Sequence, residues 1–99
     1  MKIFKRKTLI DFYSQPDYAS SKESLEAWFC ETNKASWQNG HDIKTRFPSA
    51  SFVGNDRVVF NIKGNEYRLI VKIQYKAQFV FIRFVGTHKE YDKIDAREV

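Results

Sequence analysis

The chain has 99 residues and a net charge of +5, and aromatic residues make up 16% of it. This length indicates a single domain, residues 1–99, and so many rings exclude a disordered polyelectrolyte. The positive charge favours a polyanionic partner such as a nucleic acid, an acidic protein or an anionic membrane surface. A charge that serves only solubility is the alternative.

Several classes of site are excluded by what the sequence lacks. Cys30 is the single cysteine, so an internal disulfide is impossible, and the two histidines, His41 and His88, stand far apart. No phosphate-binding glycine motif and no Gly-x-Ser-x-Gly elbow occurs. We therefore expect no metal and no cofactor. With no apolar run long enough for a signal peptide or a membrane span, we expect a cytoplasmic protein without a membrane partner.

The first half of the chain is predicted to be helical after a short opening strand, Lys2–Phe4. A first helix begins at Thr8, where Asp11 completes a start signal, and ends before Pro16. A second helix begins near Ser20 with Glu23 as its capping box.

Apolar residues through Thr32 line one face of this second helix. Cys30 lies beside that face and is expected to pack there as a small hydrophobic residue. After the Asn39–Gly40 turn, His41–Arg46 forms one more helical turn before Pro48.

The second half is predicted to be an antiparallel meander because its apolar residues recur at period two. The strands are Arg57–Lys63, Glu66–Tyr75 and Gln78–Val85, with Gly64–Asn65 as the hairpin turn. Thr87 then caps a terminal helix that runs through Ile94. The expected fold is α+β, with the N-terminal helices packed on one face of the sheet and a short helix at the C-terminal end.

Strand alternation sorts the side chains of this meander into two faces. The core face receives Val58, Phe60, Ile62, Tyr67, Leu69, Val71, Ile73, Val80, Ile82 and Phe84. The opposite, open face gathers Asn61, Arg68, Lys72 and Arg83, with Phe81 among them. Cations beside a ring suit RNA, because RNA offers phosphates for the charge and unstacked bases for the ring. A solvated face with dispersed charges is the alternative.

The segment after the last strand adds groups that can move a proton. His88 and Tyr91 are three apart and so lie on one side of a helix, and Asp92 is placed to orient the imidazole. Cleaving RNA through its own 2′-hydroxyl requires a base, an acid and positive charge at the phosphate. A capped helix with a structural His and Tyr explains the same spacing.

With these residues in view, the sequence resembles the HigB family of bacterial toxin–antitoxin toxins, relatives of the RelE ribonucleases. The resemblance spans roughly the whole chain and is strongest from residue 46 onward. Four stretches carry it, in this order: Arg46–Ala50, Val59–Asn65, Tyr67–Ile70 and Phe84–Asp92.

The resemblance implies a RelE-like fold and a metal-independent endoribonuclease, an mRNA interferase, that cleaves messenger RNA during translation on the ribosome. It also implies neutralisation by a cognate antitoxin of the HigA type, a DNA-binding protein. Partners are therefore expected to be the antitoxin, messenger RNA and the ribosome. The exposed Lys5–Lys7 cluster is a candidate contact for ribosomal RNA, with a solvated helix start as the alternative.

The family pattern transfers to this chain residue by residue. In RelE-type toxins an arginine in a Tyr-Arg-Leu strand contacts the scissile phosphate, and Arg68 matches it. His88 occupies the place of a basic residue after the last-strand glycine, and Tyr91 approximately matches a catalytic tyrosine. Val59 and Asn61 stand where RelE has paired lysines, which leaves the general base open. We favour His88 as the proton shuttle.

Arg68 is expected to stabilise charge on the phosphate, together with Lys72 or Arg83. The expected catalytic residues are Arg68, His88 and Tyr91, and the expected RNA-binding residues are Asn61, Lys63, Lys72, Arg83 and Lys89.

Two other functions use the same residues differently. A non-catalytic module that blocks translation by occupying RNA or the ribosome needs the basic face but not His88. A DNA-binding regulator is disfavoured because the sequence offers no helix-turn-helix with a basic recognition helix.

Overall fold

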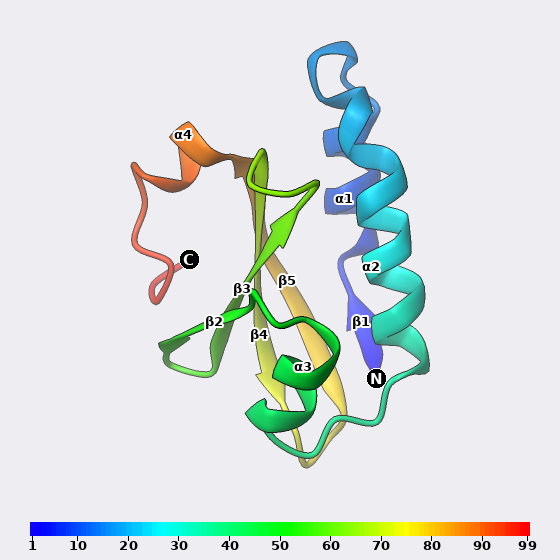
Figure 1. Cartoon of the computed structure of the whole chain (residues 1–99), viewed down its shortest axis with the longest axis vertical. Helices are drawn as coiled ribbons and strands as arrows, with labels where there is room; N and C mark the ends of the chain where they lie inside the picture. The colour runs from blue at the N-terminus through cyan, green and yellow to red at the C-terminus, as the bar shows by residue number, and fades with distance from the viewer.

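The computed structural model describes residues 1–99, which form one five-stranded sheet with helices (Figure 1). In chain order the elements are β1 Lys2–Phe4, α1 Arg6–Tyr13, the 3₁₀ helix η1 Pro16–Ser21, α2 Lys22–Lys34, α3 Gly40–Arg46, β2 Ser51–Gly54, β3 Arg57–Ile62, β4 Tyr67–Gln74, β5 Phe79–Thr87 and α4 His88–Tyr91. No helix is both long enough and apolar enough to cross a membrane.

The sheet has the strand order β1-β5-β4-β3-β2. Strands β2 to β5 are antiparallel, as in a meander, whereas β1 pairs with β5 in parallel. The α+β class is therefore confirmed, but the sheet is mixed and not purely antiparallel. The edge strand β2 was not predicted, because Ser51–Gly54 is short and most of it is exposed.

Helices α1 and α2 cover one face of the sheet, as predicted, and α4 with the C-terminal segment lies on the other (Figure 1). The main core fills the space between the helices and the sheet. Trp28 of α2 and Trp37 both pack against the ring of Phe60, which is fully buried in β3. Burying rings of this size contributes on the order of 1.5–3 kcal/mol or more per side chain to the stability of the fold.

The first helix begins two residues earlier than the sequence signal indicates. Lys5 precedes it in the left-handed conformation, with φ of 69°, and caps it with no side-chain hydrogen bond. The carboxylate of Asp11 instead accepts a hydrogen bond from Lys7 Nζ at 2.9 Å. The predicted start at Thr8 is therefore wrong, because Asp11 pairs one turn back along the helix surface.

The start of the second helix also differs from the prediction. Residues Pro16–Ser21 form a 3₁₀ turn, and α2 begins only at Lys22 without a side-chain cap. The Ser20 hydroxyl lies 2.8 Å from the Tyr67 hydroxyl, so it ties this turn to the sheet instead of capping the helix. Cys30 is exposed, contrary to the expectation that it packs in the core.

A β-bulge in β5 changes which side chains face the core. Ile70 pairs with Phe84, but the next residue, Val71, pairs with Ile82, so Arg83 is the extra residue. A single extra residue reverses the alternation beyond it. Phe84 consequently lies on the face opposite the main core, and Val85 packs against that core in its place. The prediction of Phe84 as a core residue is wrong for this reason.

The face predicted to be open carries a second, smaller apolar cluster. Val59, Ile70 and Ala96 are its buried members, and Ile94 and Val99 of the C-terminal segment pack against it. Arg57 holds the end of this segment, because its Nη2 donates to the Val99 oxygen at 2.7 Å.

The middle of the face is therefore covered, which corrects the prediction of one continuous open surface. Helix α4 is also shorter than predicted, since it ends at Tyr91 and not at Ile94.

Candidate active site

Arg68 and His88 come from two elements that the sheet brings together. Arg68 is the second residue of β4, and its partner in β5 is Gly86, two residues before His88. His88 is the first residue of α4, and its backbone N–H donates to the Glu66 carbonyl at 3.1 Å. The hairpin turn and the end of β5 thus fix the start of α4 beside the Arg68 side chain.

The Arg68 guanidinium is held in a defined position by several contacts. Its Nη1 donates to the backbone oxygens of Asn65 at 2.9 Å and Tyr67 at 3.2 Å. Its Nη2 lies 3.2 Å from Nδ1 of His88, and the guanidinium carbon lies 5.9 Å from the centre of the Tyr91 ring. The cation is thereby oriented before any ligand arrives, which favours recognition of a phosphate.

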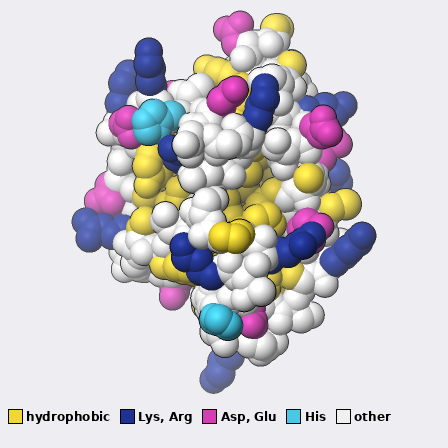
Figure 2. All heavy atoms as spheres, viewed as in Figure 1, with side chains coloured by type: hydrophobic (Ala, Val, Ile, Leu, Met, Phe, Trp, Pro, Cys, Tyr) yellow, Lys and Arg dark blue, Asp and Glu magenta, His cyan; other side chains and the backbone are white.

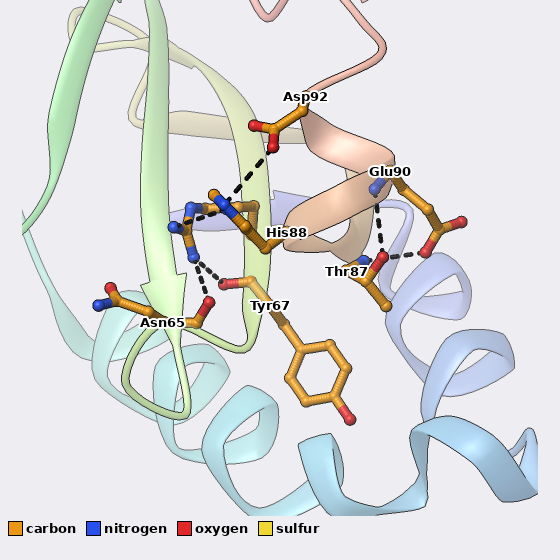
Figure 3. A network of polar contacts seen from close by, with 7 residues as sticks. Asn65, Tyr67, Thr87, His88, Glu90 and Asp92 are labelled. Atoms are coloured by element: carbon orange, nitrogen blue, oxygen red, sulfur yellow. Dashed lines mark hydrogen bonds and ion pairs between the residues drawn. The ribbon is translucent and has the colours of Figure 1, made fainter.

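The contact with Arg68 assigns the tautomer of His88. A guanidinium only donates hydrogen bonds, so Nδ1 of His88 accepts and the ring proton resides on Nε2. On the other side of the ring, Nε2 lies 3.5 Å from Oδ2 of Asp92 (Figure 3). The imidazole is therefore placed between a cation and a carboxylate, as the four-residue spacing of His88 and Asp92 predicts.

These groups are accessible to a large ligand. The side chains of His88 and Asp92 are 56% and 58% exposed, so an RNA strand can reach them without a rearrangement of the core. Their accessibility fits a polymer substrate better than a small molecule, which binds in an enclosed pocket.

Helix α4 has only four residues, and its first turn is fixed by a capping box. The Thr87 hydroxyl accepts from the backbone N–H of Glu90 at 3.2 Å, and the Glu90 carboxylate accepts from the N–H of Thr87 at 2.9 Å (Figure 3). The predicted cap at Thr87 is confirmed. These bonds satisfy donors that a short helix would otherwise leave unpaired, so they help to hold His88 in place.

Gly86 sits where no side chain fits. A Cβ at this position would lie 2.6 Å from Cζ of Phe84 and 3.3 Å from Cβ of Glu90. The bulge turns Phe84 onto this face, and its ring lies across the backbone that leads into α4. The glycine is therefore required by a close approach and not by its φ angle.

Tyr91 and three of the RNA-binding candidates lie at the same end of the sheet as Arg68. Tyr91 is half-buried and packs on the second apolar cluster, so its ring supports the guanidinium. Asn61 is the cross-strand partner of Arg68. Lys63 follows β3 and has its Nζ 3.8 Å from Oε2 of Glu66, and Lys89 is exposed on α4.

Lys72 does not join this group. Lys72 is four residues beyond Arg68 on β4, which separates the two Cα atoms by about 13 Å. Ile70 lies between them under the C-terminal segment, and Arg83 is the exposed extra residue of the bulge. The prediction that Asn61, Arg68, Lys72 and Arg83 gather in one cluster is therefore wrong for Lys72.

Charge is dispersed over the surface as well. Figure 2 shows lysine and arginine side chains around the whole visible face, several of them beside acidic ones. No group of three or more His, Cys, Asp or Glu side chains is arranged to hold a metal ion.

Sequence reasoning missed the backbone groups of this site. The carbonyls of Asn65, Glu66 and Tyr67 position Arg68 and His88, yet any residue supplies a carbonyl. The only sequence feature that could have indicated these carbonyls was the predicted hairpin turn, which brings them to the end of the sheet.

Comparisons with known proteins identify the family of this chain. Residues 21–94 match the family model of HigB toxins, described as the RelE-like toxic component of a toxin–antitoxin system. The chain is 36% identical over 77 residues to the mRNA interferase toxin HigB of Escherichia coli K12, covering 76% of this chain and 74% of that protein. The mRNA interferase HigB of Shigella flexneri matches to the same extent. The chain therefore belongs to the HigB family of RelE-like toxins.

Proposed function

We propose that this toxin is an mRNA interferase that cleaves messenger RNA with Arg68 and His88 during translation on the ribosome. Three lines support the proposal: the family, the activity named for its relatives, and the site geometry. The observation that carries it is the 3.2 Å contact between Arg68 Nη2 and His88 Nδ1, which couples a phosphate-binding cation to a proton acceptor.

The reaction transfers the phosphate within the RNA strand. The 2′-oxygen attacks the adjacent phosphorus, and the bond from phosphorus to the 5′-oxygen of the next nucleotide breaks. The 2′-hydroxyl loses one proton and the departing 5′-oxygen gains one, so the products are a 2′,3′-cyclic phosphate and a 5′-hydroxyl. No oxidant, metal or additional nucleophile is needed for this balance.

The residues of the site match these requirements. A phosphate competes with His88 for the Arg68 guanidinium, because an anion is a stronger acceptor than a neutral ring nitrogen. Once Nη2 of Arg68 donates to the phosphate instead, Nδ1 of His88 is free to accept the 2′-hydroxyl proton and then to deliver it to the leaving oxygen. Asp92 holds the imidazole in orientation and stabilises its charged form. Arg68 stabilises the charge that develops on the phosphate.

The family implies an antitoxin as partner. We propose that it is a DNA-binding protein of the HigA type, which neutralises the toxin either by covering the basic groups with acidic side chains or by blocking entry to the ribosome. Contacts with RNA and the ribosome depend on charge, so they weaken steeply as salt rises.

Expression in a bacterial host tests the proposal. Arg68→Ala and His88→Ala should each allow growth that the unaltered chain prevents, and His41→Ala is the matched control because it removes the other histidine, which is exposed on α3. Protein levels are compared by immunoblot. Equal growth inhibition by all four proteins at matched levels would contradict the proposed site.

A further inference from the structure

Three aromatic side chains form a patch of their own on the outer face of the sheet, defined by Phe4, Phe79 and Phe81. Their neighbours Val80 and Ile82 belong to the main core and Ile3 packs against it, so by alternation these rings point to the opposite face. They belong to neither apolar cluster, and all three are half-buried.

The rings of the patch pack against one another. Phe4 and Phe81 are partners across β1 and β5, with centroids 5.0 Å apart and planes inclined by only 14°. Phe79 meets Phe4 edge-on, also at 5.0 Å between centroids. Mutual packing of this kind fixes the orientation of the rings, although no side chain of the main core or of the C-terminal cluster covers them.

Positive charge lies directly beside the patch. Nζ of Lys2 is 5.3 Å from the centre of the Phe4 ring, and Lys72 is the cross-strand partner of Phe81. Gln74 is the partner of Phe79. The strand positions on this part of the face therefore carry cations and an amide but no acidic side chain.

We propose that this aromatic patch, with Lys2 and Lys72, is a second RNA-contacting surface that stacks an unpaired base of the strand bound at the cleavage site. Aromatic rings with flanking cations are the features that bind single-stranded RNA without sequence preference. Lys72, beside the patch, lies on the same face of β4 as Arg68, about 13 Å along the strand, a distance that a few unpaired nucleotides span.

This inference rests on the proposed function only in taking the bound strand to be the substrate. Its test therefore uses an RNA that cannot be cleaved: a 2′-O-methylated oligouridylate hexamer, titrated into ¹⁵N-labelled protein and followed by NMR. The amide signals of residues 4, 79 and 81 should shift together with those of residues 68 and 88. Shifts restricted to residues 68 and 88 would overturn the inference.

Side-chain variants make the test specific. Phe4→Leu with Phe81→Leu keeps an apolar surface but removes the stacked pair, and should weaken binding of the hexamer about tenfold. Phe52→Leu is the matched control, because Phe52 is an exposed ring, 44% accessible, on edge strand β2. Lys72→Gln is a second variant that leaves the rings intact and should also weaken binding. Equal affinities for all variants would overturn the proposal.

Two further outcomes separate this inference from the function proposed above. The His88→Ala variant should no longer cleave ordinary RNA. Adding the uncleavable hexamer to this variant should still shift the amide signals of residues 79 and 81. If the unaltered chain cleaves no messenger RNA on translating ribosomes but binds the hexamer at the patch, the cleavage proposal fails and the RNA surface stands. If the purified antitoxin shifts the patch signals and the hexamer does not, the surface binds protein and the inference is overturned.

Discussion

The guanidinium of Arg68 donates to the imidazole of His88, with 3.2 Å between Nη2 and Nδ1. This contact selects the tautomer of His88 that carries its proton on Nε2, facing Asp92. We propose that Nδ1 becomes free to accept a proton when Arg68 donates to a bound phosphate instead. In the proposed mechanism, the free protein thus holds its proton acceptor, Nδ1 of His88, against the cation that binds the substrate phosphate.

Asp92→Asn should slow cleavage on the order of tenfold, less than the loss that His88→Ala causes. An amide can still contact Nε2 but no longer stabilises the charged imidazole. Single-turnover rates over a range of pH, with an unaltered affinity for uncleavable RNA, would assign this effect to proton transfer. If the pH dependence of the cleavage rate is the same for D92N and for the unaltered chain, the carboxylate has no role in the reaction.

Arg68→Lys should recover little of the activity that Arg68→Ala loses, about a hundred- to a thousandfold. A lysine supplies charge but cannot contact two carbonyls and the imidazole at once, as the planar guanidinium does. Cleavage rates of the two variants at saturating RNA provide the measurement. Full activity in R68K would show that charge alone is sufficient.

Gly86→Ala should destabilise the fold by about 1–3 kcal/mol and lower activity, because its Cβ meets the Phe84 ring at 2.6 Å. The strain has to be relieved by moving Phe84 or the backbone that leads to His88. Denaturant unfolding and cleavage rates are measured in parallel.

A second variant checks the cause of that loss. Phe84→Leu in the Gly86→Ala chain shortens the obstructing side chain and should restore part of both quantities. No recovery in the double variant would place the cause elsewhere than in this contact.

The ion pair between Arg46 and Glu31 should contribute to stability at neutral pH and not in acid. Arg46 Nε donates to Glu31 Oε2 at 2.8 Å, and this hydrogen bond lowers the pKa of Glu31 below its ordinary value. A carboxylate with a lowered pKa in the folded state stabilises that state above its unfolded pKa and loses the effect as the pH falls through the folded value.

Glu31→Gln should therefore reduce the melting temperature slightly near neutral pH and leave it unchanged well below about pH 4. Both partners are exposed, so the difference is small. A difference that grows toward acid pH would have the wrong sign for this pair.

Much of the sheet follows from the sequence because its alternation is regular. The assignment of Val58, Phe60, Leu69 and Val71 to the core holds because the Gly64–Asn65 turn fixes the register of β3 and β4. Assigning faces by alternation fails after Arg83, because a bulge inserts one residue there and no residue pattern in the sequence indicates it.

The proximity of Arg68 and His88 was predicted from the sequence, but the C-terminal cover beside them was not. Arg68 and His88 meet because they lie on adjacent segments of one hairpin. The cover over Ile70 was not predicted, because Ile94, Ala96 and Val99 are too widely spaced to form a recognisable pattern. The C-terminal segment over Ile70 lies between Lys72 and the site. This separation is visible only in the structure, because it depends on the path of that segment.

Mapping the 5′ ends of messenger RNA in expressing cells tests the central claim most directly. Cells that express the unaltered chain should acquire new 5′-hydroxyl ends inside translated reading frames, and cells with Arg68→Ala or His88→Ala should not. His41→Ala should give the same ends as the unaltered chain. Growth arrest by the unaltered chain with unchanged RNA ends would contradict cleavage and would favour a toxin that blocks translation by occupancy alone.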